Sequence, residues 1–275
     1  MRPRIAVIVI TWNRLPYTRV SLPKLLSDRT EDFDLYIWDN GSQDGTVEYL
    51  HDAVDDPRIV ERHFSPANVG QGPPIEWAWR KTRADLVGKV DNDCLVTPGW
   101  TRPIAEAHAD VSMLGGIGCW HFRSQDFDER LARHKMRQFG SHRVVTHPYL
   151  DGSAFLVKRA DYVRARTSPS RCTRFWLELA RQGRVNGWYY PLILQDHMDD
   201  PRSKYFNARE SLGLTRNGWG LTDLADYDHW LRQDARHILT APSDVRFYTG
   251  WRALLRRARK RASACAVTQR QRRVL

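Results

Sequence analysis

The fold is decided by a short apolar stretch that ends in two acids, Leu86-Val87-Gly88-Lys89-Val90-Asp91-Asn92-Asp93. The residues up to Val90 predict a buried strand, so Asp91 and Asp93 follow at its carboxyl end, where open α/β sheets bind their ligands. Two carboxylates separated by one residue can hold one divalent cation that also bridges to phosphate oxygens. The same residues form a favourable turn, which is the more common use of this pattern when it stands alone. The interpretation therefore depends on the segments upstream.

The chain before this stretch alternates between strand patterns and helix patterns. Runs of β-branched and other apolar residues predict strands over residues 4–11, 33–38 and 58–64, and the stretch above supplies the fourth. Helices are expected over residues 16–27, 47–54 and 75–82, the first opened by Pro16 and the second capped by Asp44 or Thr46. This alternation predicts an α/β fold with a mainly parallel sheet of Rossmann-like winding.

Length and composition favour a soluble globular protein. With 275 residues and 41% hydrophobic side chains, the chain can form one large α/β domain, with or without a short appendage. The longest apolar run, residues 5–10, is far shorter than the roughly 20 residues of a membrane-spanning helix, and no secretion signal is visible. The four cysteines are widely spaced and indicate neither a disulfide framework nor a zinc site. We therefore expect a cytoplasmic location.

The net charge of +11 comes mostly from one segment. Nine basic residues and no acid lie between residues 251 and 275, so the rest of the chain is close to neutral. Apolar residues recur there at helical spacing and predict a basic amphipathic helix, at Trp251, Leu254, Leu255, Ala258 and Ala262. Such a helix can dock on the domain, begin a disordered tail or make a peripheral contact at the inner membrane face. A nucleic-acid partner is disfavoured because the basic residues are not spread over a groove-facing surface.

Four polar segments follow the predicted strands, and together they carry a resemblance to a known family. They are Thr11-Trp12-Asn13-Arg14, Asp39-Asn40-Gly41-Ser42-Gln43-Asp44-Gly45-Thr46, Asn68-Val69-Gly70, and Asp91-Asn92-Asp93 ahead of Thr97-Pro98-Gly99-Trp100. Their order and spacing resemble the family 2 glycosyltransferases of the GT-A fold, with the last acids in the place of the family's D-x-D motif. Residues 151–159 resemble the family's acceptor-side strand, and residues 181–197 resemble the stretch that ends in its metal-side histidine.

The resemblance implies a domain organisation. Residues 1–200 would form the GT-A catalytic domain, with a nucleotide-sugar half over 1–100 and an acceptor half over 101–200. Residues 201–250, which resemble nothing in the family, are expected to form a helical extension, and residues 251–275 the basic amphipathic helix and tail.

The resemblance also implies a metal-dependent sugar transfer from a UDP- or dTDP-sugar to a hydroxyl acceptor. Asp93 would hold Mn²⁺ or Mg²⁺, Asp91 would support the ion or the ribose, and His197 would be a further ligand. The ion neutralises negative charge that develops on the diphosphate as the sugar leaves, a contribution of several kcal/mol. Without the resemblance, His197 between Gln195-Asp196 and Met198-Asp199-Asp200 would be read as a histidine of a surface loop.

The nucleotide site is expected to include Thr11, Asn13, Arg14, Asp39, Asn40, Asp91 and Asn92. The resemblance gives Asp39 the role of accepting a hydrogen bond from a pyrimidine imide, and it places Arg14 near the phosphates. A capping role for Asp39 and simple solvation of Arg14 are the structural alternatives.

The catalytic base is less clearly indicated. An inverting transfer needs a carboxylate to take the proton from the acceptor hydroxyl. The family usually carries it in a Glu-Asp pair about a dozen residues before a glycine, but counting back from Gly183 leads to Arg171-Cys172. Asp151 is our first candidate, followed by Glu178, in a predicted helix over residues 175–181, and Asp196.

Two other functions were weighed against this interpretation. A sugar nucleotidyltransferase of related fold favours a glycine-rich phosphate loop after the first strand, and residues 11–14 contain no glycine. A basic nucleic-acid-binding protein without catalysis is disfavoured by the position of its charges. The donor sugar, the acceptor and the oligomeric state are not readable from the sequence.

Overall fold

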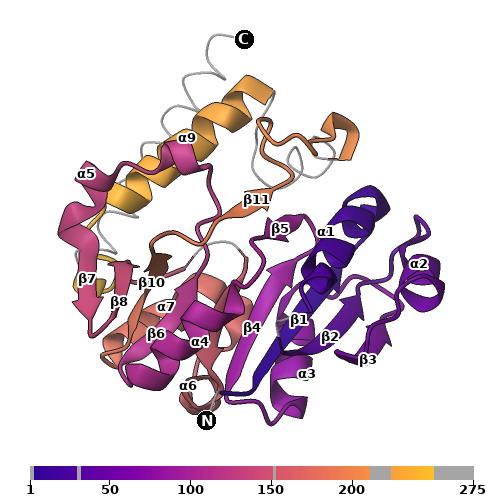
Figure 1. Ribbon diagram of the computed structural model, residues 1–275, viewed down its shortest axis with the longest axis horizontal. Helices are drawn as coiled ribbons and strands as arrows, with labels where there is room; N and C mark the ends of the chain where they lie inside the picture. Colours follow the sequence, from indigo (N-terminus) through magenta and orange to yellow (C-terminus); the bar gives the residue numbers. More distant parts are fainter. Residues whose placement is uncertain (1–2, 30–31, 151–152, 211–223, 251–275) are drawn as a thin grey trace, which may run out of the picture.

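The computed structural model describes residues 3–29, 32–150, 153–210 and 224–250, which form a mixed sheet flanked by helices (Figure 1). The nine strands of this sheet lie in the order β3-β2-β1-β4-β9-β6-β10-β8-β7. In chain order they are β1 (Ile5–Thr11), β2 (Asp34–Asp39), β3 (Ile59–Phe64), β4 (Leu86–Asp91), β6 (Leu114–Gly118), β7 (Met136–Phe139), β8 (His142–Thr146), β9 (Phe155–Lys158) and β10 (Val185–Tyr190).

The predicted α/β fold with a mainly parallel sheet is confirmed. Strands β3, β2, β1 and β4 are parallel, and β10 is parallel to β6. Strand β9 lies antiparallel between β4 and β6, and the hairpin of β7 and β8 closes the far edge. The helices are α1 (Leu15–Ser27), α2 (Thr46–Asp52), α3 (Gly72–Lys81), α4 (Thr101–Asp110), α5 (Glu129–Ala132), α6 (Arg159–Arg164), α7 (Cys172–Arg181) and α9 (Leu224–Thr240).

The core lies on both faces of the sheet. All seven residues of β1 are buried, and its side chains alternate between two hydrophobic clusters, with Ile8 on one face and Val7 and Val9 on the other. Helices α3, α7 and α9 contribute to the first cluster, and α1 and α4 contribute to the second. A strand that is covered on both faces reads as a continuous apolar run, which explains the pattern of residues 5–10.

The prediction of the N-cap residue of the second helix is wrong. The N-cap position of α2 is Gly45, with a φ of 88°, and not Asp44 or Thr46. The Asp44 carboxylate accepts hydrogen bonds from the backbone N–H and the hydroxyl of Thr46, at 3.2 and 2.6 Å. Asp44 therefore bonds to the first turn of α2 from one position further upstream.

A second, two-stranded sheet positions residues 195–197 beside the end of β4. Strand β5 (Cys94–Val96) pairs antiparallel with β11 (Gln195–His197), and the two lie side by side in Figure 1. This register sets His197 opposite Cys94, and the backbone N–H of Met198 donates to the carbonyl of Asp93 at 2.8 Å. The segment 195–198 is therefore fixed beside the end of β4.

Polar contacts fasten helix α9 to residues between 126 and 202. The Lys135 ammonium donates to the carbonyl oxygens of Ile238 and Ala241 at the C-terminal end of the helix. Near its start, Arg202 pairs with Asp228 at 2.9 Å and with Asp126 at 2.8 Å. The described part of the expected helical extension thus packs against residues before 201. Among the described residues, no helix is long and apolar enough to cross a membrane. The amphipathic helix expected over 251–262 lies outside the described residues.

A buried asparagine joins β6, α7 and the loop after β8. The Asn186 side chain, in β10, donates to the carbonyls of Pro148 and Trp176 at 2.8 and 3.0 Å and accepts from the N–H of Gly116 at 2.8 Å. These bonds satisfy backbone groups that are shielded from water.

Replacing this side chain is expected to destabilise the fold. Asn186→Ala leaves three buried backbone groups without their partner and lowers the free energy of unfolding by about 3 kcal/mol, because each lost partner costs roughly 1–3 kcal/mol. Urea unfolding followed by circular dichroism measures this change. Gln43→Ala, at an exposed position, is the control and should change the free energy by less than about 0.5 kcal/mol. Equal effects of the two substitutions would contradict the prediction.

Candidate active site

Seven of the predicted site residues line a pocket of about 410 Å³ at the carboxyl ends of β1 and β4. It is lined by Ile10, Thr11, Trp12, Arg14, Asn40, Asn68, Gly70, Gln71, Asp91, Asn92, Asp93, His197, Asp199 and Tyr227. A larger cavity of about 640 Å³ lies at the opposite ends of β1 and β2, beside α4, and none of the predicted site residues lines it. The pocket at the carboxyl ends is therefore the candidate active site.

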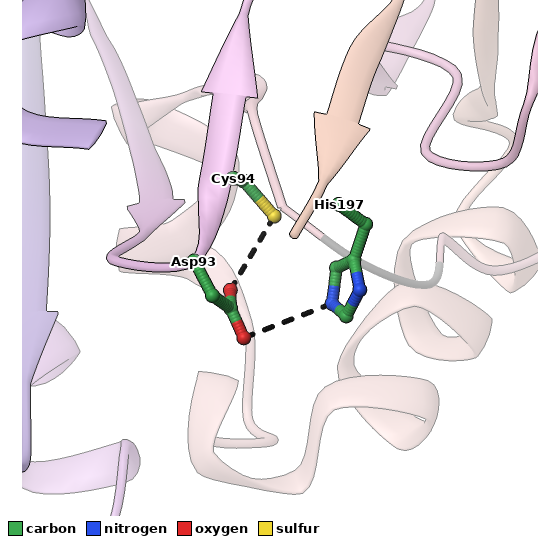
Figure 2. Close-up of side chains that lie close together, drawn as sticks. All are labelled: Asp93, Cys94 and His197. Carbon is green, nitrogen blue, oxygen red and sulfur yellow. Dashed lines mark hydrogen bonds and ion pairs between the residues drawn. The ribbon is translucent and has the colours of Figure 1, made fainter. Parts of the chain in front are cut away.

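Asp93 lies at the centre of a convergence of three side chains (Figure 2). His197 Nε2 is 3.8 Å from Asp93 Oδ2, and Cys94 Sγ is 3.5 Å from Asp93 Oδ1. The pairing of β5 with β11 produces this arrangement, since it sets His197 across from the residue that follows Asp93. The structure thus brings together the acid and the histidine that the sequence resemblance assigned to a metal ion.

The donor set of this cluster fits a hard divalent cation. A carboxylate oxygen and an imidazole nitrogen are ligands that Mn²⁺ accepts, with remaining positions for water and phosphate oxygens. Burial raises the pKa of the Cys94 thiol well above its ordinary value, so the sulfur stays protonated and is a poor ligand. Asp93 and His197 are therefore the residues that could hold the ion.

Arg14 supplies a buried positive charge to the same cluster. Its guanidinium donates to Asp93 Oδ2 at 2.8 Å and to Asp199 Oδ1, and all three side chains are nearly inaccessible to solvent. Asn13 and Arg14 both have left-handed backbone conformations, with φ of 53° and 65°, which direct the chain sharply from β1 into α1. Few non-glycine residues adopt this conformation, and it is often found at functional sites.

Burial and neighbouring charges shift the pKa values of Asp93, Arg14 and Tyr227. Burial raises the pKa of the Asp93 carboxyl, and the neighbouring Asp199 adds to this, while His197 and Arg14 oppose it. Burial lowers the pKa of Arg14, but Asp93 and Asp199 outweigh burial and raise it overall. Burial also raises the pKa of the Tyr227 hydroxyl, and Asp199 and Asp93 strengthen the shift. Arg14 therefore remains charged and Tyr227 remains a neutral phenol at ordinary pH.

Asp91 faces the pocket but has a different partner. Its Oδ1 accepts a hydrogen bond from the Lys89 ammonium at 2.6 Å, and its backbone N–H donates to the Ser153 hydroxyl at 2.7 Å. The side chain of Asp91 is 23% exposed, whereas that of Lys89 is 7% exposed. The two acids of the D-x-D sequence are therefore held by separate cations.

Asp39, the acid predicted to recognise the nucleotide base, already accepts hydrogen bonds from other residues of the protein. Asp39 is fully buried and accepts hydrogen bonds from the Ser42 backbone N–H, the Ser42 hydroxyl and the Thr11 hydroxyl, at 2.8, 2.5 and 2.8 Å. These bonds require a tight loop at Gly41, where φ is 76° and a Cβ atom would lie 2.9 Å from the backbone of Ala67. Asp39 organises the loop and does not line the pocket.

The other predicted nucleotide residues divide into two groups. Thr11, Arg14, Asn40, Asp91 and Asn92 line the pocket. Asn13 does not, because its side-chain oxygen accepts from the backbone N–H of Gln43 at 2.9 Å.

The described candidates for the catalytic base lie away from the pocket. The Glu178 carboxylate accepts from the backbone N–H groups of Arg166 and Thr167 at 2.7 and 2.8 Å, an arrangement that fixes the loop before α7. Asp196 lies 3.2 Å from Arg123 and lines a neighbouring cavity of about 340 Å³. Asp151 lies outside the described residues.

Seven of the residues that line the pocket were not predicted as site residues: Ile10, Trp12, Asn68, Gly70, Gln71, Asp199 and Tyr227. Trp12 stands within a quoted motif and is 41% exposed, with its indole at the pocket. Asp199 follows His197 closely, in a run of acids that suggested only a surface loop. Gln71 precedes α3, and Tyr227 comes from α9, in a region that resembled no known family. Ile10, Trp12, Asn68, Gly70 and Gln71 lie within or directly beside the polar motifs, and Asp199 lies two residues after His197, so Tyr227 alone lacked a sequence signal.

Comparisons with known proteins identify the family of this chain. The family model described as "Glycosyl transferase family 2" matches residues 6–171. A Haemophilus influenzae protein described as an uncharacterized glycosyltransferase is 24% identical over 91 residues, which are 33% of this chain and 36% of that protein. The chain thus matches about a third of that relative's length.

Two solved structures share the fold. One is the mannosyltransferase PcManGT from Pyrobaculum calidifontis in complex with GDP-Man and Mn²⁺, with a TM-score of 0.58, 18% identity, and coverage of 96% of this chain and 81% of that chain. The other is S. aureus TarS 1–349 in complex with UDP-GlcNAc, with a TM-score of 0.51, 14% identity, and coverage of 89% and 75%. At these identities the likeness establishes a GT-A architecture.

Removing the buried guanidinium is expected to destabilise the protein. Arg14→Met leaves Asp93 and Asp199 without this cation and lowers the free energy of unfolding by about 3–5 kcal/mol, as for other broken buried ion pairs. Adding Asp199→Asn should recover part of the loss, because one of the two buried charges is then removed. Urea unfolding of the single and double variants measures both effects. A double variant that is less stable than Arg14→Met would contradict this account.

Proposed function

This chain belongs to glycosyl transferase family 2, and we propose that it transfers a sugar from a nucleotide-diphosphate donor to a hydroxyl acceptor with the help of a divalent cation. The observation that carries the proposal is the convergence of Asp93 and His197 in a pocket that Arg14 and Asp91 also line. Such a pocket offers both the ligands of a cation and a guanidinium for a diphosphate.

In this proposal Asp93 and His197 hold Mn²⁺ or Mg²⁺, and the mixed oxygen and nitrogen donors favour Mn²⁺. The bound ion stabilises the negative charge of the departing diphosphate as a Lewis acid. Arg14 binds the same group, because a guanidinium matches phosphate oxygens in geometry and charge.

The donor nucleotide is proposed to carry uracil or thymine. The exposed indole of Trp12 offers a flat surface for a base. Asp39 Oδ1 accepts a hydrogen bond from the Ser42 backbone N–H and has a lone pair left for an imide N–H, but Asp39 is fully buried, so the loop around it must open first. PcManGT was solved with GDP-Man and TarS with UDP-GlcNAc, so both base classes occur on this fold and need a direct comparison.

We propose Asp151 as the general base of an inverting transfer. Ser153, two residues further along the chain, bonds to the backbone N–H of Asp91 in the pocket, which supports this choice over the two described candidates. Glu178 and Asp196 are each engaged by other groups of the protein.

A thermal-shift panel tests the donor and the metal. Ligands that bind the native state raise its apparent stability. We expect UDP or dTDP to raise the Tm more than GDP, and only when Mn²⁺ is present. Asp93→Asn should abolish the Mn²⁺-dependent part, while Asp52→Asn, at an exposed acid, should retain it. A shift by UDP that is equal with and without Mn²⁺ would contradict a role for the metal, and a larger shift by GDP would contradict the pyrimidine preference.

Turnover of the donor tests the base. Asp151→Asn should reduce kcat by about 10²-fold or more, the effect expected for loss of a general base. The donor identified by the panel is the substrate, and release of its nucleoside diphosphate is the measurement. The Mn²⁺-dependent thermal shift should remain, because the base does not hold the donor. An unchanged kcat for Asp151→Asn, together with a loss of this size for Glu178→Gln or Asp196→Asn, would move the role to that residue.

A further inference from the structure

A lysine lies inside the central strand β4. Lys89 is 6% exposed and is flanked in the sheet by Ile8 of β1 and Phe155 of β9. Lysine is seldom buried unless it is paired, because an unpaired ammonium loses its hydration at a cost of several kcal/mol. The groups that pair with the Lys89 ammonium therefore indicate its role in the site.

The Lys89 ammonium reaches two side chains that line the candidate active site. It donates to Asp91 Oδ1 at 2.6 Å and to Gln71 Oε1 at 3.1 Å. Lys89 and Asp91 are two positions apart on a strand, so their side chains lie on the same face of the sheet. Lys89 itself lines a small adjoining cavity of about 60 Å³ and not the pocket. The Lys89 ammonium therefore hydrogen-bonds to the pocket residues Asp91 and Gln71 without lining the pocket itself.

This contact makes the two acids of the D-x-D sequence unequal. Asp91 is paired with a cation that does not line the pocket, and among the described residues no hydrogen bond engages its other oxygen, Oδ2. Asp93 is also paired with a cation, but that cation is Arg14, which lines the pocket, and Asp93 lies near His197 as well. The Asp91 carboxylate is therefore neutralised and fixed in orientation, with Oδ2 left to accept a hydrogen bond.

We propose that Lys89 is a positioning residue that commits Asp91 to a hydroxyl of the sugar nucleotide and leaves the cation to Asp93 and His197. The assignment rests on the proposed function for the presence of the cation. A carboxylate that is already oriented loses less freedom when a ribose or sugar hydroxyl binds. The ion pair with Lys89 also weakens the attraction between the Asp91 carboxylate and a cation in the pocket.

The test is the binding of Mn²⁺ alone to the full chain, read from the electron paramagnetic resonance signal of the free ion. Lys89→Met frees the Asp91 charge and should tighten Mn²⁺ binding about 5-fold or more. Lys89→Met combined with Asp91→Asn removes the pair without changing the net charge and should stay within about 3-fold of the wild type. Asp93→Asn removes a ligand and should weaken binding about 10-fold or more.

Several outcomes would overturn the assignment. If the double variant loses as much affinity as Asp93→Asn, Asp91 is a metal ligand. If the Lys89→Met variant and the wild type have the same affinity for Mn²⁺, or if neither of these two proteins binds the ion, Lys89 does not direct Asp91. Lys135→Met is the matched control, because it removes a buried lysine whose ammonium donates to the carbonyl oxygens of Ile238 and Ala241. A similar change in this control would make the effect of Lys89 a general structural one.

Kinetics separate this role from simple packing. With the donor that the panel identifies, Lys89→Met should raise KM by about 10-fold with a smaller change in kcat, because Asp91 contacts the donor and not the reacting proton. A fall in kcat at constant KM would contradict the role. Mn²⁺ binding is read without donor or acceptor, so a protein that follows the predicted binding pattern but transfers no sugar would contradict the proposed function and leave the role of Lys89 intact.

Discussion

Buried carboxylates at the carboxyl end of the sheet are the constraint on which the site depends. Asp93 and Asp199 would be costly to bury as isolated charges, and Arg14 contacts both of them. Asp91 is matched in the same way by Lys89. Each cation comes from a strand or loop that is fixed by the sheet, so the acids are paired and held in place before any ligand binds. Preorganised charges of this kind are what a site for a diphosphate leaving group requires.

The path of the chain around Arg14 shows how the fold meets this constraint. Strand β1 ends at Thr11, and two successive residues in left-handed conformations turn the chain into α1. The turn is supported by the neighbouring loop, where the Asn13 backbone N–H donates to the Ser42 hydroxyl at 2.7 Å. Ser42 is also bonded to Asp39, so the buried Asp39 carboxylate helps to hold the turn that aims Arg14 at Asp93.

The C-terminal part of the chain completes the pocket, although the family match ends at residue 171. Strand β11 supplies His197, the loop after it supplies Asp199, and α9 supplies Tyr227. Arg202 ties this loop to η1 (Ser124–Asp126) and to α9 through Asp126 and Asp228. Changes in these tethers therefore act on the pocket even though they lie outside the matched segment.

The sequence by itself determined the strands that lead to the pocket, the α/β class and the place of Asp93 at the end of β4. These features depend on the periodicity of neighbouring residues and on the order of the polar segments, which are local properties. The tertiary structure decided the partners of the polar side chains: Arg14 with Asp199, Lys89 with Asp91, and Asp39 with Thr11 and Ser42. It also brought Tyr227 to the pocket and turned Glu178 toward a loop. Such pairings join residues that are far apart in the chain or that face one another only after a strand is buried, and local patterns do not encode those distances.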